Sequence, residues 1–257
     1  MNRRMFAQAM GGAAAAAGLA GAQPAGGRTA IYRLDYFYFR QGSQGARISE
    51  FLSSQMPLIV KNTRAAGVFT TVLGPHVPMT LLLEGFGSLE DMEAADRRLH
   101  GDAGYRAAFE KIEQGAEPPF DYCDRVLLRA TDFSPEIAAL AEKPKAPRIF
   151  ELRVYHSPTE RQLGYLHQRF AGPEISVFHQ SGIFPILYTD TLAGPNMPNL
   201  TYLIPFASLA DREKAWAAFF ANPDWVKARD ESVAHGGQIV ASTAQVILQP
   251  APFSPIQ

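Results

Sequence analysis

The chain contains one unit twice, and this duplication limits its fold more than any other feature. Residues 74–110 align with residues 194–230 without a gap, at a constant offset of 120. Each copy carries a Gly-Pro-x-x-Pro segment followed by a Ser-Leu-x-Asp segment. Upstream, residues 31–34 match residues 149–152 at an offset of 118. Such self-similarity means that one supersecondary unit occurs in two copies.

Both copies have the same predicted order of elements. Runs rich in apolar and β-branched residues predict four strands in each, over 31–39, 68–73, 80–86 and 123–130, and over 149–155, 183–191, 200–206 and 239–248. A first helix is expected over 46–66 and 159–181, ended by Gly67 and Gly182. Ser88 and Ser208 are expected to cap a second helix, and Asn222 with Pro223 to start a further one.

The order βαββαβ is that of a ferredoxin-like split unit. A sheet with helices on one face needs cover for its other face, and two such units can cover each other. We therefore predict the α+β class, with two tandem ferredoxin-like units packed face to face as a fused dimeric α/β-barrel.

The predicted limits are 29–133 for the first unit, 134–147 for a linker and 148–250 for the second unit. Residues 1–27 differ in character. Arg3 and Arg4 precede a weakly apolar run, and residues 20–22 have the small-x-small pattern of a cleavage site. This segment resembles a twin-arginine signal peptide, which predicts export to the periplasm or the cell exterior. No other segment approaches 18 apolar residues, so no stable membrane span is expected in the mature form.

Composition excludes several classes of site. The formal net charge is −1, with 24 Lys and Arg against 25 Asp and Glu, which argues against binding to nucleic acid by phosphate neutralisation. The single cysteine, Cys123, cannot form an intrachain disulfide or a cysteine-based zinc site. The six histidines form no His-x-x-x-His or His-x-His pair, so no metal site is predicted.

The second copy carries a recognisable set of motifs. They are Phe-Glu-Leu-Arg-Val-Tyr at 150–155, Gly-x-Phe at 182–184, Ser-Leu-x-Asp-Arg-x-x-Ala-Trp at 208–216 and Asn-Pro-Asp-Trp at 222–225. As a set they resemble the NIPSNAP family. The first copy is degenerate, because it has Asp96 and Tyr105 at the positions of Trp216 and Trp225. The resemblance implies the dimeric α/β-barrel superfamily, which contains cofactor-independent monooxygenases, isomerases and haem enzymes.

The first strand of each unit carries the candidate site residues. Alternation places Tyr32, Leu34 and Tyr36 on one face, which we expect under the helices. The opposite face carries Arg33, Asp35 and Phe37 in the first unit and Glu151, Arg153 and Tyr155 in the second, and we expect it to point into the barrel. Buried charges must be paired or serve a ligand. These charges are therefore an ion-pair network across the unit interface or the polar floor of a pocket, unless a different strand register leaves them exposed on the surface.

In the pocket interpretation the catalytic residues are Arg153, which binds an anionic group, with Tyr155 or Glu151 moving protons. The ligand-binding residues are Arg33, Asp35, Phe37 and His167. The sequence then predicts an exported NIPSNAP-type protein that binds a small molecule inside the barrel, as a cofactor-independent monooxygenase or isomerase. The alternatives are a haem protein that uses His167 or another histidine, and a non-catalytic assembly or interaction protein. No motif implies a cofactor, and sheet edges offer a route to a homo-oligomer.

Overall fold

The computed structural model describes residues 27–137 and 144–257. The expected signal segment falls almost entirely outside the described residues, and so does part of the expected linker. The elements follow one another in the order β1 (Ile31–Tyr38), α1 (Gln44–Asn62), β2 (Ala65–Leu73), β3 (Met79–Phe86), α2 (Leu89–Gly101), α3 (Ala103–Glu113), β4 (Tyr122–Ala130), β5 (Ile149–His156), α4 (Glu160–Arg169), η1 (Phe170–Glu174), α5 (Ile175–Gln180), β6 (Leu187–Ala193), β7 (Asn199–Phe206), α6 (Leu209–Ala221), α7 (Pro223–Gly236) and β8 (Ser242–Pro250).

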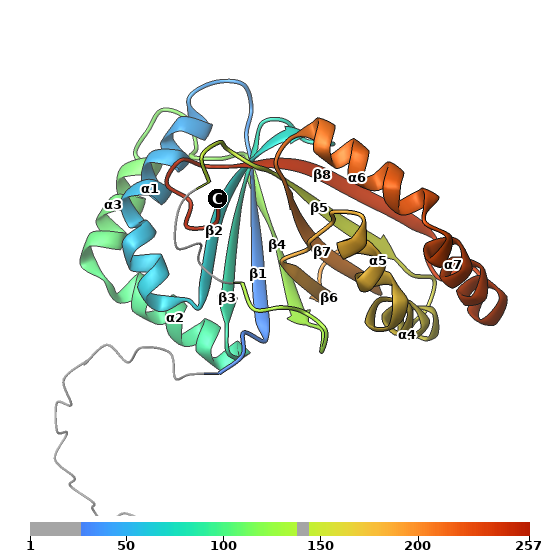
Figure 1. Ribbon diagram of the computed structural model, residues 1–257. Coiled ribbons are helices and arrows are strands. Elements are labelled where there is room, and N and C mark those ends of the chain that lie inside the picture. The colour runs from blue at the N-terminus through green and yellow to red at the C-terminus, as the bar shows by residue number, and fades with distance from the viewer. Residues whose placement is uncertain (1–26, 138–143) are drawn as a thin grey trace, which may run out of the picture.

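The eight strands form one closed barrel in the order β1-β3-β2-β8-β5-β7-β6-β4. Each unit contributes four antiparallel strands in the ferredoxin-like order, and the units join where β2 pairs with β8 and β4 pairs with β6. Helices α1–α3 cover one outer side of the barrel and α4–α7 cover the other (Figure 1). This confirms the predicted fold class. Because the barrel closes within one chain, its described strands leave no free edge, and a homo-oligomer would need another surface.

The local signals for helix starts are confirmed. The side chains of Ser88 and Ser208 accept hydrogen bonds from the backbone N–H of the third residue after each, at the start of α2 and α6. Asn222 caps α7 by accepting from the backbone N–H of Asp224, two residues on, with Pro223 in the first turn. Gly182 follows α5 with φ +81°, a conformation that favours glycine.

Two predictions about the first helices were wrong. Helix α1 ends at Asn62, and Gly67 lies inside β2, where a Cβ atom would come within 2.9 Å of Phe69 and Ile256. Gly67 is therefore required by close packing and not by a helix cap. In the second unit the helix is interrupted by a π-helical turn, η1, that contains Gly172 and Pro173. Proline lacks the N–H that a regular helix needs.

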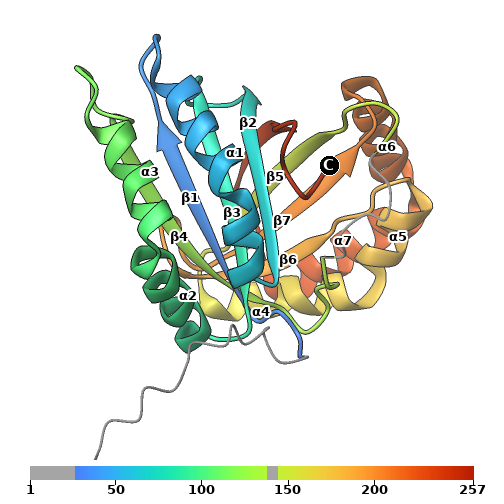
Figure 2. The ribbon, with the colours of Figure 1, turned by 90° about the vertical axis from the view of Figure 1, so that its left-hand side faces the viewer.

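The predicted assignment of strand faces was also wrong. Tyr32 and Leu34 pack inside the barrel with apolar residues of every strand, among them Leu81, Leu128 and Phe150. The face with Arg33 and Asp35 lies beneath the helices instead, on the side of the sheet that α1, α2 and α3 cover (Figure 2). The interior of an eight-stranded barrel is filled mainly by packed side chains and leaves room for a small ligand at most. The carboxylates that neutralise Arg33 lie on the helix-covered face of the sheet, outside the barrel.

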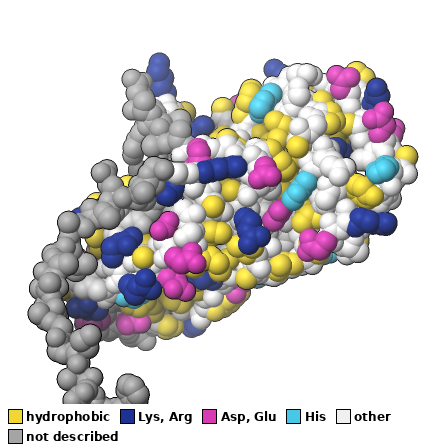
Figure 3. All heavy atoms as spheres, turned by 90° about the horizontal axis from the view of Figure 1, so that it is seen from below, with side chains coloured by type: hydrophobic (Ala, Val, Ile, Leu, Met, Phe, Trp, Pro, Cys, Tyr) yellow, Lys and Arg dark blue, Asp and Glu magenta, His cyan; other side chains and the backbone are white. Residues whose placement is uncertain are grey.

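The outer surface mixes charges of both signs. On the face shown in Figure 3, Lys and Arg side chains alternate with Asp and Glu, and apolar side chains lie between them. None of the described helices is long and apolar enough to cross a membrane.

Candidate functional site

A cavity of about 300 Å³ lies between the sheet of the first unit and its three helices. Its walls are apolar, with aromatic and aliphatic side chains in equal number, and its floor and rim carry charges. The lining residues are Arg33, Asp35, Phe37, Ile48, Phe51, Leu52, Ile59, Leu82, Glu84, Asp96, Leu99, His100, Tyr105, Phe109, Phe120, Cys123 and Arg125. A concave apolar space with a few convergent polar groups is the usual form of a small-molecule site.

Arg33 is the centre of the polar floor. Its Nε and Nη2 donate to Oε2 of Glu84 at 2.9 and 2.7 Å, because Arg33 on β1 and Glu84 on β3 are direct cross-strand partners. Its Nη1 donates to Oδ2 of Asp96 on α2 at 2.7 Å. Arg33 therefore ties the sheet to the helix that covers it.

Asp35 has a different partner at the edge of the same cavity. Arg125 on β4 donates from Nε and Nη2 to the two oxygens of Asp35, both at 2.7 Å. Arg125 is half exposed while Asp35 is buried. This bidentate pair holds a cation at the mouth of the cavity, where a ligand could meet it.

Glu84 is the group in this cavity best suited to accept a proton. It is 1% exposed, and burial raises its pKa although Arg33 lowers it. Both hydrogen bonds from Arg33 end on Oε2, so among the described residues no hydrogen bond engages Oε1. Burial lowers the pKa of Arg33 while Glu84, Asp96 and Asp35 raise it, and the net direction is upward. Arg33 therefore stays charged.

The rim of the cavity carries groups of weaker acidity. Burial raises the pKa of Tyr105 to about 12, and its ring meets His100 edge-on at 5.7 Å. The Nδ1 atom of His100 lies 2.8 Å from the backbone oxygen of Asp96. Burial and, to a smaller extent, the charge of the nearby Asp35 raise the pKa of Cys123 to about 11. The thiol is therefore protonated at neutral pH and is a poor nucleophile.

The second unit has side chains where the first has the cavity. Trp216 and Phe219 of α6 are almost fully buried against Phe178, and the matching positions on α2 hold Asp96 and Leu99. The volume lost when a tryptophan is replaced by aspartate thus remains open as a ligand-sized space in the first unit.

The predicted catalytic residues lie together in the second unit, sealed by these aromatics. Glu151 is 0% exposed and accepts from Arg153, from Arg212 and from Nε1 of Trp216, at 2.7 to 2.9 Å. Burial raises its pKa, but the hydrogen bond from Arg212 and the charge of Arg153 outweigh burial and hold the pKa below its usual range. Arg153 also donates to the hydroxyls of Tyr202 and Tyr155 at 3.0 and 3.2 Å. Their catalytic role remains a prediction.

The two charged clusters do not meet. Arg33 and Asp35 pair within the first unit, while Glu151 and Arg153 pair within the second. The expected ion-pair network across the unit interface was therefore wrong, for the same reason as the face assignment. Phe37 lines the cavity of the first unit beside Arg33 and Asp35.

His167 is separated from the other predicted ligand-binding residues. It lies on α4 of the second unit, with Nε2 2.7 Å from Oδ1 of Asp190, and its ring meets Phe133 edge-on. Asp190 thus already occupies the nitrogen that an axial haem ligand would use, so His167 does not fit the role that the haem alternative gives it. No group of three or more potential metal-ligating side chains occurs among the described residues.

Glu174 is a second buried carboxyl, at the end of η1. Its Oε2 accepts from Nε of Arg169 at 2.7 Å, and within the described chain its buried Oε1 has no hydrogen-bond partner. Burial raises its pKa to about 7 although Arg169 lowers it. Between pH 4.5 and 7 the folded chain therefore keeps a proton that the unfolded chain loses, and stability falls as pH rises.

We expect this carboxyl to lower the free energy of unfolding by about 3 kcal/mol between pH 4 and pH 8. Glu174→Gln removes the titrating group, so its stability should change less over this range than that of the natural protein. Urea unfolding at both pH values measures the difference. Glu160→Gln, at an exposed position of α4, is the control. Parallel pH profiles for Glu174→Gln and the natural protein would contradict the prediction.

Sequence reasoning missed the cavity and three of its charged residues, Glu84, Asp96 and Arg125. Two signals pointed to them. The first is the loss of both tryptophans from the first unit. The second is Glu84 inside the otherwise apolar strand β3, at the position that Ile204 holds in the second unit.

Comparisons with known proteins agree with this architecture. Residues 150–255 match the family model NIPSNAP. A "putative monooxygenase" from Lactobacillus acidophilus NCFM is 11% identical, covers 86% of this chain and 94% of its own, and has a TM-score of 0.55. An anthrone oxidase-like protein is 14% identical, with 87% and 92% covered and a TM-score of 0.52.

A NIPSNAP family protein from Agrobacterium tumefaciens strain C58 is 21% identical. It covers 48% of this chain and 100% of its own, with a TM-score of 0.40, which carries no argument about the fold. No curated protein matches the chain significantly. The second unit is thus similar in sequence to NIPSNAP proteins, and the two units together share their fold with the first two structures.

Proposed function

We propose that the chain binds an apolar, ring-containing small molecule in the cavity of its first unit and oxidises it with dioxygen, without a cofactor. The observation that carries this proposal is the open cavity with Glu84 in its floor, one carboxylate oxygen of which accepts no hydrogen bond from the described residues. Its aromatic walls suit a flat ring system. Arg33 and Arg125 can donate hydrogen bonds to a carbonyl or phenolate oxygen of the same molecule.

Glu84 would act as the general base. It would remove a proton from a carbon next to the ring system, and the resulting carbanion would reduce dioxygen. Overall, one CH₂ group and O₂ give one C=O group and one water molecule, so dioxygen is the oxidant. The names of two structural neighbours, a monooxygenase and an anthrone oxidase-like protein, are consistent with this reaction class. An isomerase would use the same proton transfer but consume no dioxygen.

The test uses anthrone, a tricyclic aromatic ketone, as the probe. Oxygen uptake on an electrode together with formation of the quinone would support the oxygenase. Exchange of the acidic carbon-bound hydrogens with deuterium under argon, without oxygen uptake in air, would identify an isomerase. The absence of both, with anthrone bound, would leave a binding protein and overturn the proposed reaction.

Filling the cavity should weaken binding. Leu99 is buried in the cavity wall, and the second unit has the larger Phe219 at the same position. We expect Leu99→Phe to weaken anthrone binding at least about tenfold, about 1.4 kcal/mol, measured by titration calorimetry. Overpacking costs about 1–3 kcal/mol of stability, so the fold should survive.

The reciprocal variant, Phe219→Leu, is the matched control, because it changes the same pair of residue types in the other unit. Its affinity for anthrone should equal that of the natural protein. If Leu99→Phe bound anthrone with unchanged affinity while remaining folded, the ligand would lie elsewhere.

A further inference from the structure

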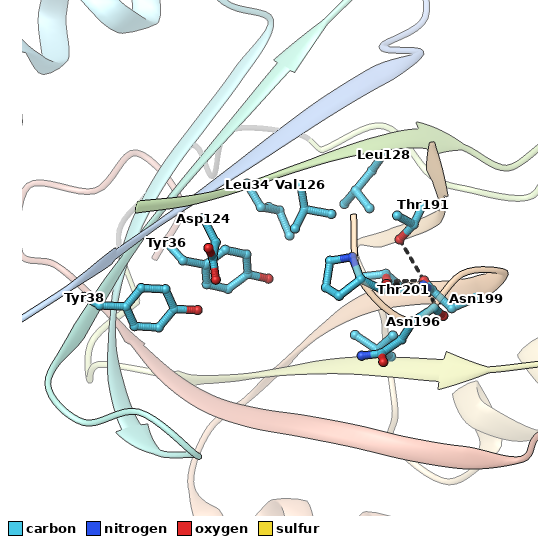
Figure 4. A pocket seen from close by; sticks show the side chains of 12 residues that line it. Leu34, Tyr36, Tyr38, Asp124, Val126, Leu128, Thr191, Asn196, Asn199 and Thr201 are labelled. Carbon is cyan, nitrogen blue, oxygen red and sulfur yellow. Dashed lines mark hydrogen bonds between the residues drawn. The ribbon is translucent and has the colours of Figure 1, made fainter. Parts of the chain in front are cut away.

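A second cavity, of about 120 Å³, lies in the barrel at the end where β1 and β5 finish (Figure 4). Both units contribute to it. The apolar part of its wall consists of Leu34, Val126, Leu128 and Val154, and the polar part comes from Tyr36, Tyr38 and Asp124 on one side. On the other side lie Asn199 and two threonines of β6 and β7.

The polar groups on the second-unit side are already satisfied. The side-chain oxygen of Asn199 accepts from Thr191 at 2.8 Å and from Thr201 at 3.0 Å. Its Nδ2 donates to the backbone oxygens of Pro195 and Asn196 at 3.2 and 2.9 Å. These hydrogen bonds hold the loop that contains Pro195 and Asn196, and they leave little hydrogen-bonding capacity for a ligand.

Tyr36, Tyr38 and Asp124 remain as the groups that a ligand could meet. In Figure 4 the two tyrosine hydroxyls point into the cavity, and the carboxylate of Asp124 lies beside the Tyr36 ring. Burial and, to a smaller extent, the charge of Asp124 together raise the pKa of Tyr38 to about 12. None of the described residues that line this cavity is Lys, Arg or His, so its charge is −1.

These three groups are a departure from the repeated pattern. Tyr36 on β1 pairs with Asp124 on β4, and the matching pair in the second unit is Val154 and Ala244 on β5 and β8. In the second unit the barrel therefore packs at this end without a carboxylate. Barrel packing alone does not account for the carboxylate of Asp124 in the first unit.

We propose that this cavity binds a small primary amine in its cationic form. A primary ammonium has three N–H donors, which match the Asp124 carboxylate and the two tyrosine hydroxyl oxygens. A charge-assisted hydrogen bond to a carboxylate is about twice as strong as a neutral one. The alkyl chain would lie against Leu34, Val126 and Leu128. This site is separate from the proposed oxygenase cavity, on the opposite face of β1.

The test compares n-butylammonium with 1-butanol, which has nearly the same shape but no charge, using chemical-shift titration of the full chain. Butylammonium should bind at least tenfold more tightly than butanol. Asp124→Asn should lower its affinity at least tenfold and leave that of butanol unchanged. Asp230→Asn, on the outer surface of α7, is the matched control and should change neither.

Equal affinities for the amine and the alcohol, or an unchanged affinity in Asp124→Asn, would overturn the proposal. Tyr38→Phe gives an independent measurement, because it removes one acceptor and keeps both the ring and the charge. It should weaken butylammonium binding alone, by a smaller factor than Asp124→Asn. Tetramethylammonium, which has no N–H donor, should bind more weakly than butylammonium, and tighter binding would point to a quaternary ligand instead.

Discussion

Glu84→Gln is expected to slow oxidation of the anthrone probe by a factor of about 10²–10⁴, the usual contribution of a positioned general base. Gln keeps an acceptor for Arg33, so the hydrogen bond that fixes the floor of the cavity can survive, while the group can no longer take a proton. Oxygen uptake per enzyme, at saturating anthrone, measures the effect. In the natural protein the rate should rise with pH through the raised pKa of Glu84, because only the carboxylate is a base.

Glu174→Gln is the control for this variant. Glu174 is also buried, also bonded to one arginine and also has a raised pKa, but it lies in the other unit. Its replacement should leave oxygen uptake unchanged. An unchanged rate in Glu84→Gln, with the variant folded by circular dichroism, would remove Glu84 from the mechanism. Loss of rate in both variants would indicate a general effect of buried carboxyls on the fold.

The architecture was predictable because the duplication carries it. Two copies of the order βαββαβ leave two uncovered sheet faces, and packing the two sheets face to face covers both. The helix starts were also predictable, since Ser88, Ser208 and Asn222 act on backbone groups within three residues of themselves. The break at Gly172 and Pro173 was visible in the sequence as well, but the apolar periodicity continues across it.

The orientation of the strand faces was not predictable by the same means. Alternation separates Arg33 and Asp35 from Tyr32 and Leu34, but it does not say which set faces the barrel interior. The answer depends on partners from distant segments, Glu84, Asp96 and Arg125. The size of the cavity depends in turn on how far the helices stand from the sheet. The replacement of two tryptophans indicates lost volume, but not whether neighbouring side chains refill it.

Glu151→Ala is expected to lower the free energy of unfolding by about 3–5 kcal/mol, since removing one partner of a buried ion pair leaves the other charge uncompensated. Here the effect falls on two cations, Arg153 and Arg212, and on Nε1 of Trp216. Glu151→Gln keeps an acceptor and the side-chain volume, so its loss should be smaller. Urea unfolding at neutral pH measures both.

Glu213→Ala is the matched control for Glu151→Ala, because Glu213 binds the same Arg212 but its side chain is 72% exposed. Exposed ion pairs contribute about 0–1 kcal/mol, so this variant should be close to the natural protein. A loss below about 1 kcal/mol in Glu151→Ala would show that water reaches Arg153 and Arg212, and the second unit would then hold an accessible site. If Glu151→Gln stayed folded but lost oxygen uptake, the catalytic centre would lie in the second unit. Retained uptake would assign the second unit's charges to holding the sheet and helix α6 together, and leave the chemistry to the first.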